Sequence, residues 1–305
     1  MGRHSSPEKL GTPKIILMGM LFLILAGSSY LVMNTFFAQQ QESTPVTTEK
    51  KLHPKASSIF ESSEEIADSS STQQSSELEL QLDTAPLTTK AEHVYYGVHY
   101  FKQNKDISSN NSAPTVSASV IKVFIMEYAF TQADLNETIE GQTLNDWIIP
   151  MIQQSDNDAA NVLIDHFGMD ELNEFFQIQG YRDTHLERRM LDDEARSQGK
   201  ENYTSLNDCM SFLKRLYQQQ EAAPQAMMLA VMKGQTLRTK IPSKLSEDIL
   251  VANKTGELGN VENDIGLVFS KDNPFAIVVL SNHCTNSEGI RNAIGDFTLA
   301  ATKVY

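Results

Sequence analysis

The stretch from Ser119 to Phe130 constrains the fold most, because nearly every residue in it is apolar. A helix that is apolar all round belongs in a protein interior. Lys122 lies within this stretch, so the sequence predicts a buried lysine, which must be paired, hydrogen-bonded or deprotonated. Ser119 lies three residues earlier and therefore on the same face of a helix. This spacing is typical of a serine nucleophile beside a lysine that acts as its base, and the alternative is a serine that caps the helix and a lysine whose amine extends to solvent.

The N-terminal region predicts a membrane anchor. Residues 15–38 contain no charged side chain, and Arg3, Lys9 and Lys14 precede them. Such a run is long enough to span a bilayer, and its basic flank favours a cytoplasmic N-terminus. We therefore predict a cytoplasmic tail at 1–14 and a single-pass signal-anchor at 15–38 in the cell membrane. The catalytic domain then lies outside the cell. A cleaved signal peptide is the alternative, although the apolar run is long for one and Ala38 ends a poor cleavage site.

Residues 39–92 are rich in Ser, Thr, Gln and Glu, and contain a single aromatic residue, Phe60, and no glycine. A segment of this composition cannot bury enough apolar surface to offset its ordering entropy. We predict a disordered stalk at 39–92 and a folded domain at 93–305.

Charge and cysteine usage exclude several kinds of partner. The net charge is −14 and no run of Lys or Arg is present, which argues against nucleic acid. Cys209 and Cys284 form no disulfide framework and no metal-binding spacing, and whether they pair is left open. The seven histidines are scattered. We expect no metal and no cofactor.

The order of elements predicts an α/β (α+β) fold. A strand-like segment at 93–101 is followed by a polar loop at 104–112 and then by helix-like segments up to about residue 233. The chain then returns to strands and ends on a helix, at 249–255, 264–269, 275–281 and 287–305. We predict an antiparallel sheet that is built from both ends of the domain and flanked by helices. An all-helical lobe from about 119 to 235 is inserted into it.

Three short motifs follow one another in the order Ser119-Val-Ile-Lys122, Ser155-Asp156-Asn157 and Lys254-Thr255-Gly256. Each is weak alone, but the ordered set resembles class A β-lactamases and penicillin-binding proteins. The resemblance covers roughly residues 93–305 and implies a β-lactamase/transpeptidase-like fold. It also implies a serine hydrolase that is acylated at Ser119 by β-lactams or by D-Ala-D-Ala-like cell-wall peptides. Together with the predicted anchor, this makes the expected protein a membrane-anchored serine hydrolase.

The resemblance assigns catalytic roles to four residues. Ser119 attacks the carbonyl and Lys122 takes its proton. Ser155 relays a proton to the departing nitrogen, since a hydroxyl both donates and accepts. Asn157 holds Lys122 and the amide of the substrate. Asp156 braces its own loop.

The late strand supplies the substrate-binding residues Lys254, Thr255, Gly256 and Glu257. Lys254 provides positive charge for a substrate carboxylate, and Gly256 lets the substrate backbone approach the strand. In the family, the oxyanion hole is made by backbone N–H groups that fall here on Ser119 and Glu257. Glu257 departs from the family, which has a small or hydroxyl residue after K-T-G, and it places a negative side chain near the site.

A second departure concerns release of the acyl group. Class A enzymes carry a glutamate in a T-x-L-x-R-x-E-P pattern, and here Thr184-His-Leu-Glu-Arg-Arg-Met190-Leu191 has Met190 at that place. Because a thioether accepts no proton, we predict slow deacylation. The nearby carboxylates of Asp192, Asp193 and Glu194 are out of register with the glutamate of the family pattern. The alternative is that one of them acts as the base in its place, and this alternative predicts fast hydrolysis.

A competing function is a non-hydrolytic penicillin-binding, sensor or cell-wall-binding module, in which acylation is terminal or absent. The lifetime of an acyl adduct distinguishes this module from a hydrolase.

Overall fold

The computed structural model describes residues 82–305. The predicted tail at 1–14, the signal-anchor at 15–38 and the stalk up to residue 81 lie outside the described residues. Among residues 82–305, no helix combines the length and the apolar character that crossing a bilayer requires.

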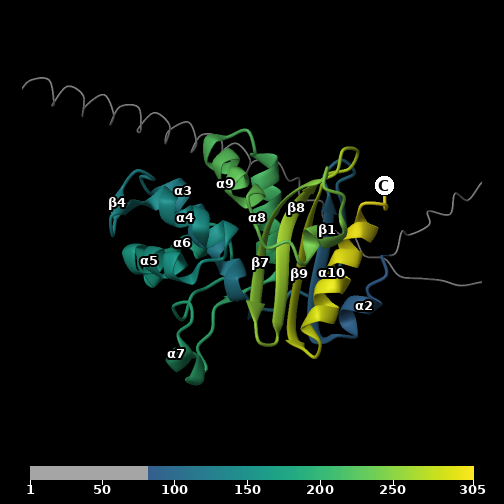
Figure 1. The fold of residues 1–305 in the computed structure, drawn as a ribbon, viewed down its shortest axis with the longest axis horizontal. Coiled ribbons are helices and arrows are strands. Elements are labelled where there is room, and N and C mark those ends of the chain that lie inside the picture. Colours follow the sequence, from purple (N-terminus) through teal and green to yellow (C-terminus); the bar gives the residue numbers. More distant parts are fainter. Residues whose placement is uncertain (1–81) are drawn as a thin grey trace, which may run out of the picture. The chain divides into compact units, whose positions relative to one another are not determined.

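A five-stranded sheet forms the centre of the domain, with the strand order β2-β1-β9-β8-β7 and antiparallel pairing throughout (Figure 1). The strands are β1 (Ala91–Tyr100), β2 (Lys105–Ser108), β7 (Leu250–Leu258), β8 (Val261–Phe269) and β9 (Phe275–Cys284). The late strand β9 lies between β1 and β8, so both ends of the domain meet in one sheet. The predicted antiparallel architecture is confirmed.

Both faces of this sheet are covered. In β9, Phe275, Ile277 and Val279 face one apolar core and their neighbours Ala276 and Val278 face the other, as the two-residue period of a strand requires. On one face lie α10 (Ser287–Ala301) and α2 (Ala85–Thr88), and on the other lie α8 (Leu206–Gln218) and α9 (Ala223–Lys233) (Figure 1). This coverage explains why the late strands contain so many apolar residues in sequence.

The helical lobe surrounds α3 (Lys122–Gln132), which is buried along most of its length. The ring of Phe124 packs against the rings of Tyr181 and Phe212, with centroids 4.7 and 5.7 Å away. The other lobe helices are α4 (Leu144–Gln153), α5 (Asn157–Phe167), α6 (Met169–Ile178) and α7 (Asp193–Ser197). The predicted central, buried helix and the helical lobe are therefore confirmed.

Short strands and turns lie between the main elements, and one two-stranded hairpin lies within the lobe, which is therefore not all helical. The short elements are β3 (Thr115–Val116), which pairs with β6 (Tyr203–Thr204), the hairpin β4 (Thr138–Ile139) with β5 (Gln142–Thr143), and the 3₁₀ turns η1 (Ala118–Ile121) and η2 (Ile241–Lys244). The serine segment predicted as α-helical is η1, and the α-helix begins only at Lys122. Ala118 has a left-handed φ of 45°, which no α-helix accommodates.

The folded domain begins earlier than the predicted boundary at residue 93, which falls inside β1. Leu82 and Leu87 are buried in the core beneath α10. Because α2 is one turn long, it produces no periodic pattern, and the Thr-rich composition around it is typical of the stalk. The edge strand β2 was likewise predicted as a loop, since its four residues are mostly polar.

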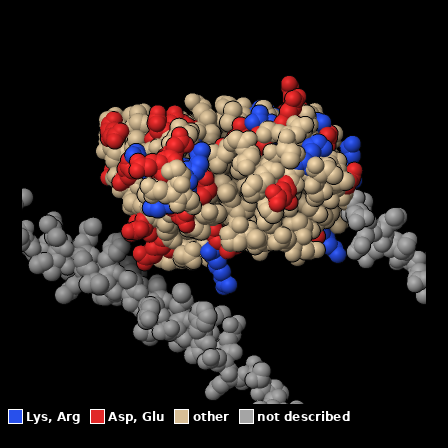
Figure 2. Space-filling view, turned by 90° about the horizontal axis from the view of Figure 1, so that it is seen from below, with Lys and Arg blue, Asp and Glu red and all other residues tan. Residues whose placement is uncertain are grey.

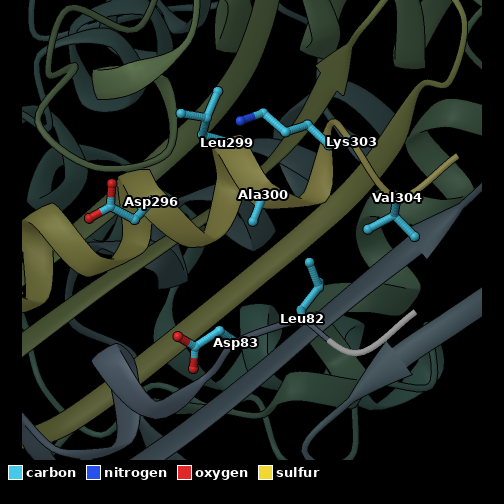
Figure 3. A pocket seen from close by; sticks show the side chains of 7 residues that line it. All are labelled: Leu82, Asp83, Asp296, Leu299, Ala300, Lys303 and Val304. Atoms are coloured by element: carbon cyan, nitrogen blue, oxygen red, sulfur yellow. The ribbon is translucent and has the colours of Figure 1, made fainter. Parts of the chain in front are cut away.

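A cavity of about 330 Å³ lies between α10 and the start of the described chain (Figure 3). Its lining consists of Leu82, Asp83, Asp296, Leu299, Ala300, Lys303 and Val304. It belongs to the α10 side of the sheet, whereas the predicted catalytic residues lie on the side of the helical lobe.

Candidate active site

Ser119 lies in the η1 turn and is half-buried. The turn is fixed from behind, because the backbone N–H and the hydroxyl of Ser117 both donate to the carbonyl of Asn202, at 2.9 and 3.0 Å. Among the described residues, the Ser119 hydroxyl has no hydrogen-bond partner. It is therefore positioned by its backbone and free to meet a ligand.

Lys122 is completely buried, as predicted, and its ammonium is held by the Ser155–Asn157 loop. Its Nζ donates to the Ser155 carbonyl at 2.7 Å, to Asn157 Oδ1 at 2.8 Å and to Ser155 Oγ at 3.5 Å. Burial lowers the pKa of Lys122 to about 7, although the charge of Asp156 acts in the opposite direction. A large fraction of this amine is consequently neutral near pH 7, as a general base requires.

The loop that carries Ser155 adopts a strained conformation. Ser155 has a left-handed φ of 60°, which costs a non-glycine residue on the order of 1–3 kcal/mol. Asp156 Oδ1 accepts from the Ala159 N–H at 3.0 Å and so caps α5, which is the bracing role predicted from the sequence. The cap holds the loop in the position in which the Ser155 carbonyl and the Asn157 side chain accept hydrogen bonds from Lys122.

Lys254 reaches the same hydroxyl from the sheet. Its Nζ donates to Ser155 Oγ and to the Thr255 carbonyl, both at 2.8 Å, and the side chain is completely buried. Burial and then the nearby charge of Lys122 hold the pKa of Lys254 well below its usual value. The Ser155 hydroxyl thus lies between two lysines and connects the helical lobe to β7.

Gly256 allows β7 to lie against the turn of the nucleophile. A Cβ at this position would be 2.8 Å from the Ser117 carbonyl oxygen and 3.1 Å from Val120 Cγ2. Any side chain would therefore push β7 away from η1. The close packing against η1 therefore requires glycine at this position, which the sequence did not indicate. The predicted role of Gly256 toward a substrate backbone stays a prediction.

Glu257 is tied to two cations that sequence reasoning missed. Its carboxylate accepts from Lys240 Nζ at 2.6 Å and from Arg291 Nη2 at 3.2 Å. Glu262, its partner across the β7–β8 ladder, contacts the same two cations at 3.0 and 2.8 Å. Partial burial alone raises the pKa of Glu257, but the hydrogen bond from Lys240 and the two positive charges outweigh it and hold the pKa below its usual value.

The comparisons with known proteins agree with this geometry. The model of the beta-lactamase enzyme family matches residues 139–305, more than half of the chain. The chain belongs to this family. The match includes the Ser155-Asp156-Asn157 and Lys254-Thr255-Gly256 motifs and begins after Ser119. None of the curated proteins that were compared matches the chain.

Solved structures show the same fold as this beta-lactamase family member. A beta-lactamase from Sphaerobacter thermophilus is 24% identical, with a TM-score of 0.63, and the alignment covers 72% of this chain and 94% of that one. An ancestral class A beta-lactamase (GNCA) is 17% identical, with a TM-score of 0.65 and coverages of 72% and 97%. PBP-A is 21% identical, with a TM-score of 0.60 and coverages of 69% and 90%.

Met190, which the sequence motif aligns with the glutamate of class A enzymes, is fixed in the structure by Asn161. The Met190 N–H donates to Asn161 Oδ1 at 2.7 Å, and its carbonyl accepts from Asn161 Nδ2 at 3.1 Å. The Met190 side chain is 7% exposed and packs in the core of the lobe. This position is therefore filled by an apolar group that cannot activate water.

The three alternative carboxylates have other surroundings. Asp192 Oδ1 accepts from the Ala195 N–H at 2.9 Å and caps α7. Asp193 is 85% exposed and pairs with Arg196 at 3.3 Å, and Glu194 is exposed. Among the described residues, none of them hydrogen-bonds to a residue of the candidate site. The geometry thus gives no support for a substitute base in this loop.

The loop that carries Met190 is closed by a buried ion pair, and Asn202 at its end contacts the η1 turn that carries Ser119. Arg188 Nε donates to Glu201 Oε1 at 2.7 Å, with both side chains largely buried. Next to it, Asn202 Oδ1 accepts from the backbone N–H groups of Glu187 and Arg188, at 2.9 and 3.1 Å. Since the Asn202 carbonyl also holds Ser117, the loop and the η1 turn form one unit.

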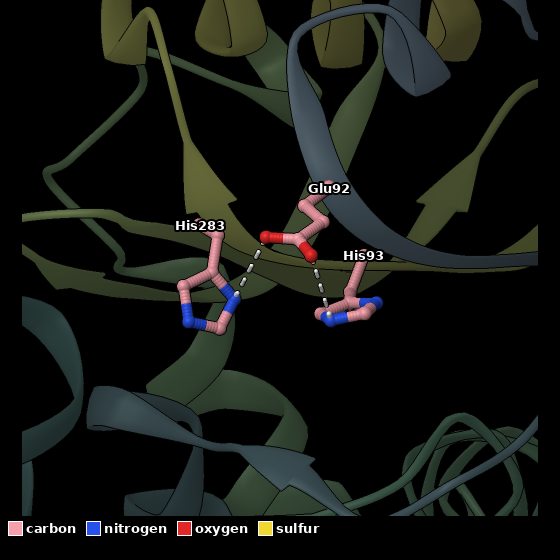
Figure 4. Close-up of side chains that lie close together, drawn as sticks. All are labelled: Glu92, His93 and His283. Atoms are coloured by element: carbon pink, nitrogen blue, oxygen red, sulfur yellow. Dashed lines mark ion pairs between the residues drawn. The ribbon is translucent and has the colours of Figure 1, made fainter.

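Glu92, His93 and His283 form a surface cluster that the scattered histidines of the sequence did not reveal. The Glu92 carboxylate lies between the two imidazoles, at 3.9 Å from His93 and 4.0 Å from His283 (Figure 4). These side-chain types bind metals, but all three are exposed. The cluster lies on β1 and β9, with β8 between it and the Lys254 strand.

Proposed function

We propose that this protein is a membrane-anchored serine hydrolase that forms an acyl-enzyme at Ser119 outside the cell. One observation carries the proposal: a continuous set of hydrogen bonds joins Lys122, Ser155, Asn157 and Lys254. Ser119 precedes Lys122 by three residues, and its hydroxyl has no partner among the described residues. A buried lysine with a pKa of about 7 is what a serine nucleophile needs as its base.

The reaction follows from these contacts. Ser119 Oγ attacks an amide carbonyl and forms a C–O bond, while neutral Lys122 accepts the hydroxyl proton. The tetrahedral intermediate then collapses by breaking the C–N bond. The departing nitrogen takes a proton from the Ser155 hydroxyl, which is re-protonated from one of the two lysines beside it. The acyl group remains as an ester on Ser119.

The substrates that fit this chemistry are β-lactams and the D-Ala-D-Ala-like peptides of cell walls. Support comes from the solved structures, because a variant of PBP-A is described as an acyl-enzyme complex with penicillin G. An anchor at 15–38 places the domain next to a cell wall, where such peptides occur.

A second candidate function shares the acylation step and differs in the release of the acyl group. The apolar packing of Met190 favours it, since no group at that position activates water. In this case the protein is a penicillin-binding or sensor module that stays acylated.

Intact-mass measurement over time tests both candidates on the full chain in detergent. We expect penicillin G to add its whole mass, because ring opening releases no fragment, and the adduct to persist for minutes or longer. Ser119→Ala should abolish the adduct, whereas Ser197→Ala, which removes a hydroxyl from exposed α7, should not. A short-lived adduct with product accumulation identifies a hydrolase. The absence of any adduct refutes the proposal.

A further inference from the structure

Glu92, His93 and His283 form a group of side chains that the proposed acylation does not use. The three lie at one end of the sheet, where β1 begins and β9 ends (Figure 4). His93 pairs with Asn282 in the antiparallel β1–β9 ladder, so the neighbouring residues Glu92 and His283 lie opposite each other. Residues from the two ends of the folded domain therefore meet on one patch of its surface.

The three side chains converge without bonding to one another. Glu92 Oε1 lies 3.9 Å from His93 Nε2, and Glu92 Oε2 lies 4.0 Å from His283 Nδ1. Both distances exceed the length of a hydrogen bond. One ligand atom from each of the three side chains nevertheless lies within 4.8 Å of the other two. A cation placed among them contacts all three donors at once.

The donor set of two imidazoles and one carboxylate fits Zn²⁺. Its bonds to nitrogen and oxygen are about 2.0–2.2 Å long in tetrahedral sites, which places neighbouring donor atoms about 3.3–3.6 Å apart. The donors here must therefore move inward by about 1 Å. The three side chains are 51–68% exposed, so they are free to rotate into these positions. Ca²⁺ and Mg²⁺ fit less well, because they prefer oxygen ligands.

A cavity of about 280 Å³ adjoins the cluster, and the imidazoles of His93 and His283 both line it. Asn282 also lines this cavity, and it is only 5% exposed. Its Oδ1 atom is buried and has no hydrogen-bond partner among the described residues. Buried acceptors of this kind normally pair with water or a ligand. Since three protein ligands leave the fourth position of tetrahedral zinc open, the cavity offers a water at that position both room and an acceptor.

We propose that Glu92, His93 and His283 form a zinc site that links the start of β1 to the end of β9. Each imidazole contributes one nitrogen and Glu92 contributes a carboxylate oxygen. The ligands come from distant segments and meet only in the folded domain, so bound metal stabilises the folded state. No spacing in the sequence indicates this site, because only the folded ladder brings its ligands together. The inference does not depend on the acylation of Ser119, since β8 separates the cluster from the Lys254 strand.

Equilibrium dialysis of the full chain in detergent against Zn²⁺ measures the number of bound ions and their affinity. Weak binding to other carboxylates must be kept out of this count. Residues 119–235 contain nine Lys or Arg and 19 Asp or Glu, and in the view of Figure 2 carboxylates gather over the lobe end of the molecule. Groups that offer only oxygen also bind Mg²⁺, so an excess of Mg²⁺ saturates them. We expect one Zn²⁺ per chain to remain bound in this excess.

Two variants remove one ligand each. They are His93→Ala and His283→Asn, and asparagine tolerates the left-handed φ of 54° at position 283. Each should weaken Zn²⁺ binding by about tenfold or more, since the loss of an outer partner of a ligand already costs about 10–100-fold. The matched control is His185→Ala, because His185 also lies beside a carboxylate, Glu187 at 3.3 Å, but belongs to no group of three ligands among the described residues. This variant should bind Zn²⁺ as the wild type does.

Thermal unfolding tests the link between the two strands. With Zn²⁺ at about 100 times its Kd, the Tm of the wild type should rise by roughly 5–10 °C, and removal of the metal with EDTA should reverse the rise. The rise should be smaller in His93→Ala and in His283→Asn, and unchanged in His185→Ala. The inference is overturned if the wild type retains no Zn²⁺ in excess Mg²⁺, or if both ligand variants bind Zn²⁺ as tightly as the wild type. A bound Zn²⁺ that leaves the Tm of the wild type unchanged also overturns it. The wild-type measurements decide even if a variant folds poorly.

Discussion

At the scale of single residues, the decisive arrangement is one hydroxyl between two buried lysines. Lys122 and Lys254 both donate to Ser155 Oγ, at 3.5 and 2.8 Å. Burial lowers the pKa of both lysines, and the charge of Lys122 lowers the pKa of Lys254 further. The arrangement favours the loss of a proton from this pair, which is the condition for a neutral base.

The rate of acylation should depend on pH through Lys122. The reactive form is the neutral amine, so the rate should rise with pH and reach half its maximum near the Lys122 pKa of about 7. Stopped-flow acylation by penicillin G measures this profile. Lys122→Arg keeps a cation that does not deprotonate and should lose acylation at every pH. A rate that is constant from about pH 5.5 to 8.5 would contradict Lys122 as the base.

A carboxylate at position 190 should accelerate release. The backbone of residue 190 is held by its two hydrogen bonds to Asn161, so Met190→Glu should place a carboxylate at a fixed position in this loop. A positioned general base contributes about 10²–10⁴-fold, so the lifetime of the adduct should shorten by a factor in this range. Met190→Gln has the same shape without the base and serves as the control. Equal lifetimes in the two variants would show that water activation does not limit release.

At the scale of elements, the loop from residue 187 to 202 is held by the buried Arg188–Glu201 pair. Removing one partner of a buried pair costs roughly 3–5 kcal/mol, because the other charge is left uncompensated. For a domain of this size, Arg188→Met should therefore lower Tm by about 6–20 °C. Lys200→Met removes an exposed cation from the same loop, for which the described residues show no ion pair, and should change the free energy of unfolding by less than about 1 kcal/mol. Calorimetry measures the Tm of both variants. Similar Tm values would contradict a structural role of the Arg188–Glu201 pair.

Strong patterns made the main elements predictable from the sequence. The apolar run after Ser119 predicted the buried α3, and the β-branched runs near the C-terminus predicted β7, β8 and β9. Elements without a pattern were missed. The single-turn α2 is too short for periodicity, and the left-handed Ala118, which delays the start of α3, has no sequence signal because alanine is a good helix former.

The residues of the candidate site also differ in how far the sequence could predict them. Ser119, Lys122, Ser155 and Lys254 belong to local motifs, and the structure brings Lys122, Ser155 and Lys254 into direct contact. The partners of Glu257 were not predictable, since Lys240 and Arg291 lie 17 and 34 positions away in the sequence. Only the folded sheet brings these charges together, and no spacing rule connects them.

At the scale of the whole molecule, the predicted anchor determines where the chemistry takes place. Residues 15–38 lie outside the described residues, and their charge-free length still predicts a span. We expect the full chain to fractionate with membranes and to keep its N-terminus. Deletion of residues 1–38 should release a domain that penicillin G still acylates. N-terminal sequencing checks this prediction, and a mature protein that begins near Gln39 would identify a cleaved signal instead.

The position of β9 also determines when the site forms during folding. β1 pairs with β9 from Ala91 with Cys284 to Tyr100 with Phe275, residues at nearly opposite ends of the domain. Contacts so distant in sequence form slowly, because a long loop must close first. β8 and β9 are consecutive in sequence and pair locally, whereas β1 and β9 each present an apolar edge until they pair, which favours association with other chains. Newly made copies are therefore vulnerable to aggregation before β1 and β9 pair, and chaperones that protect strand edges should affect their yield more than their final stability.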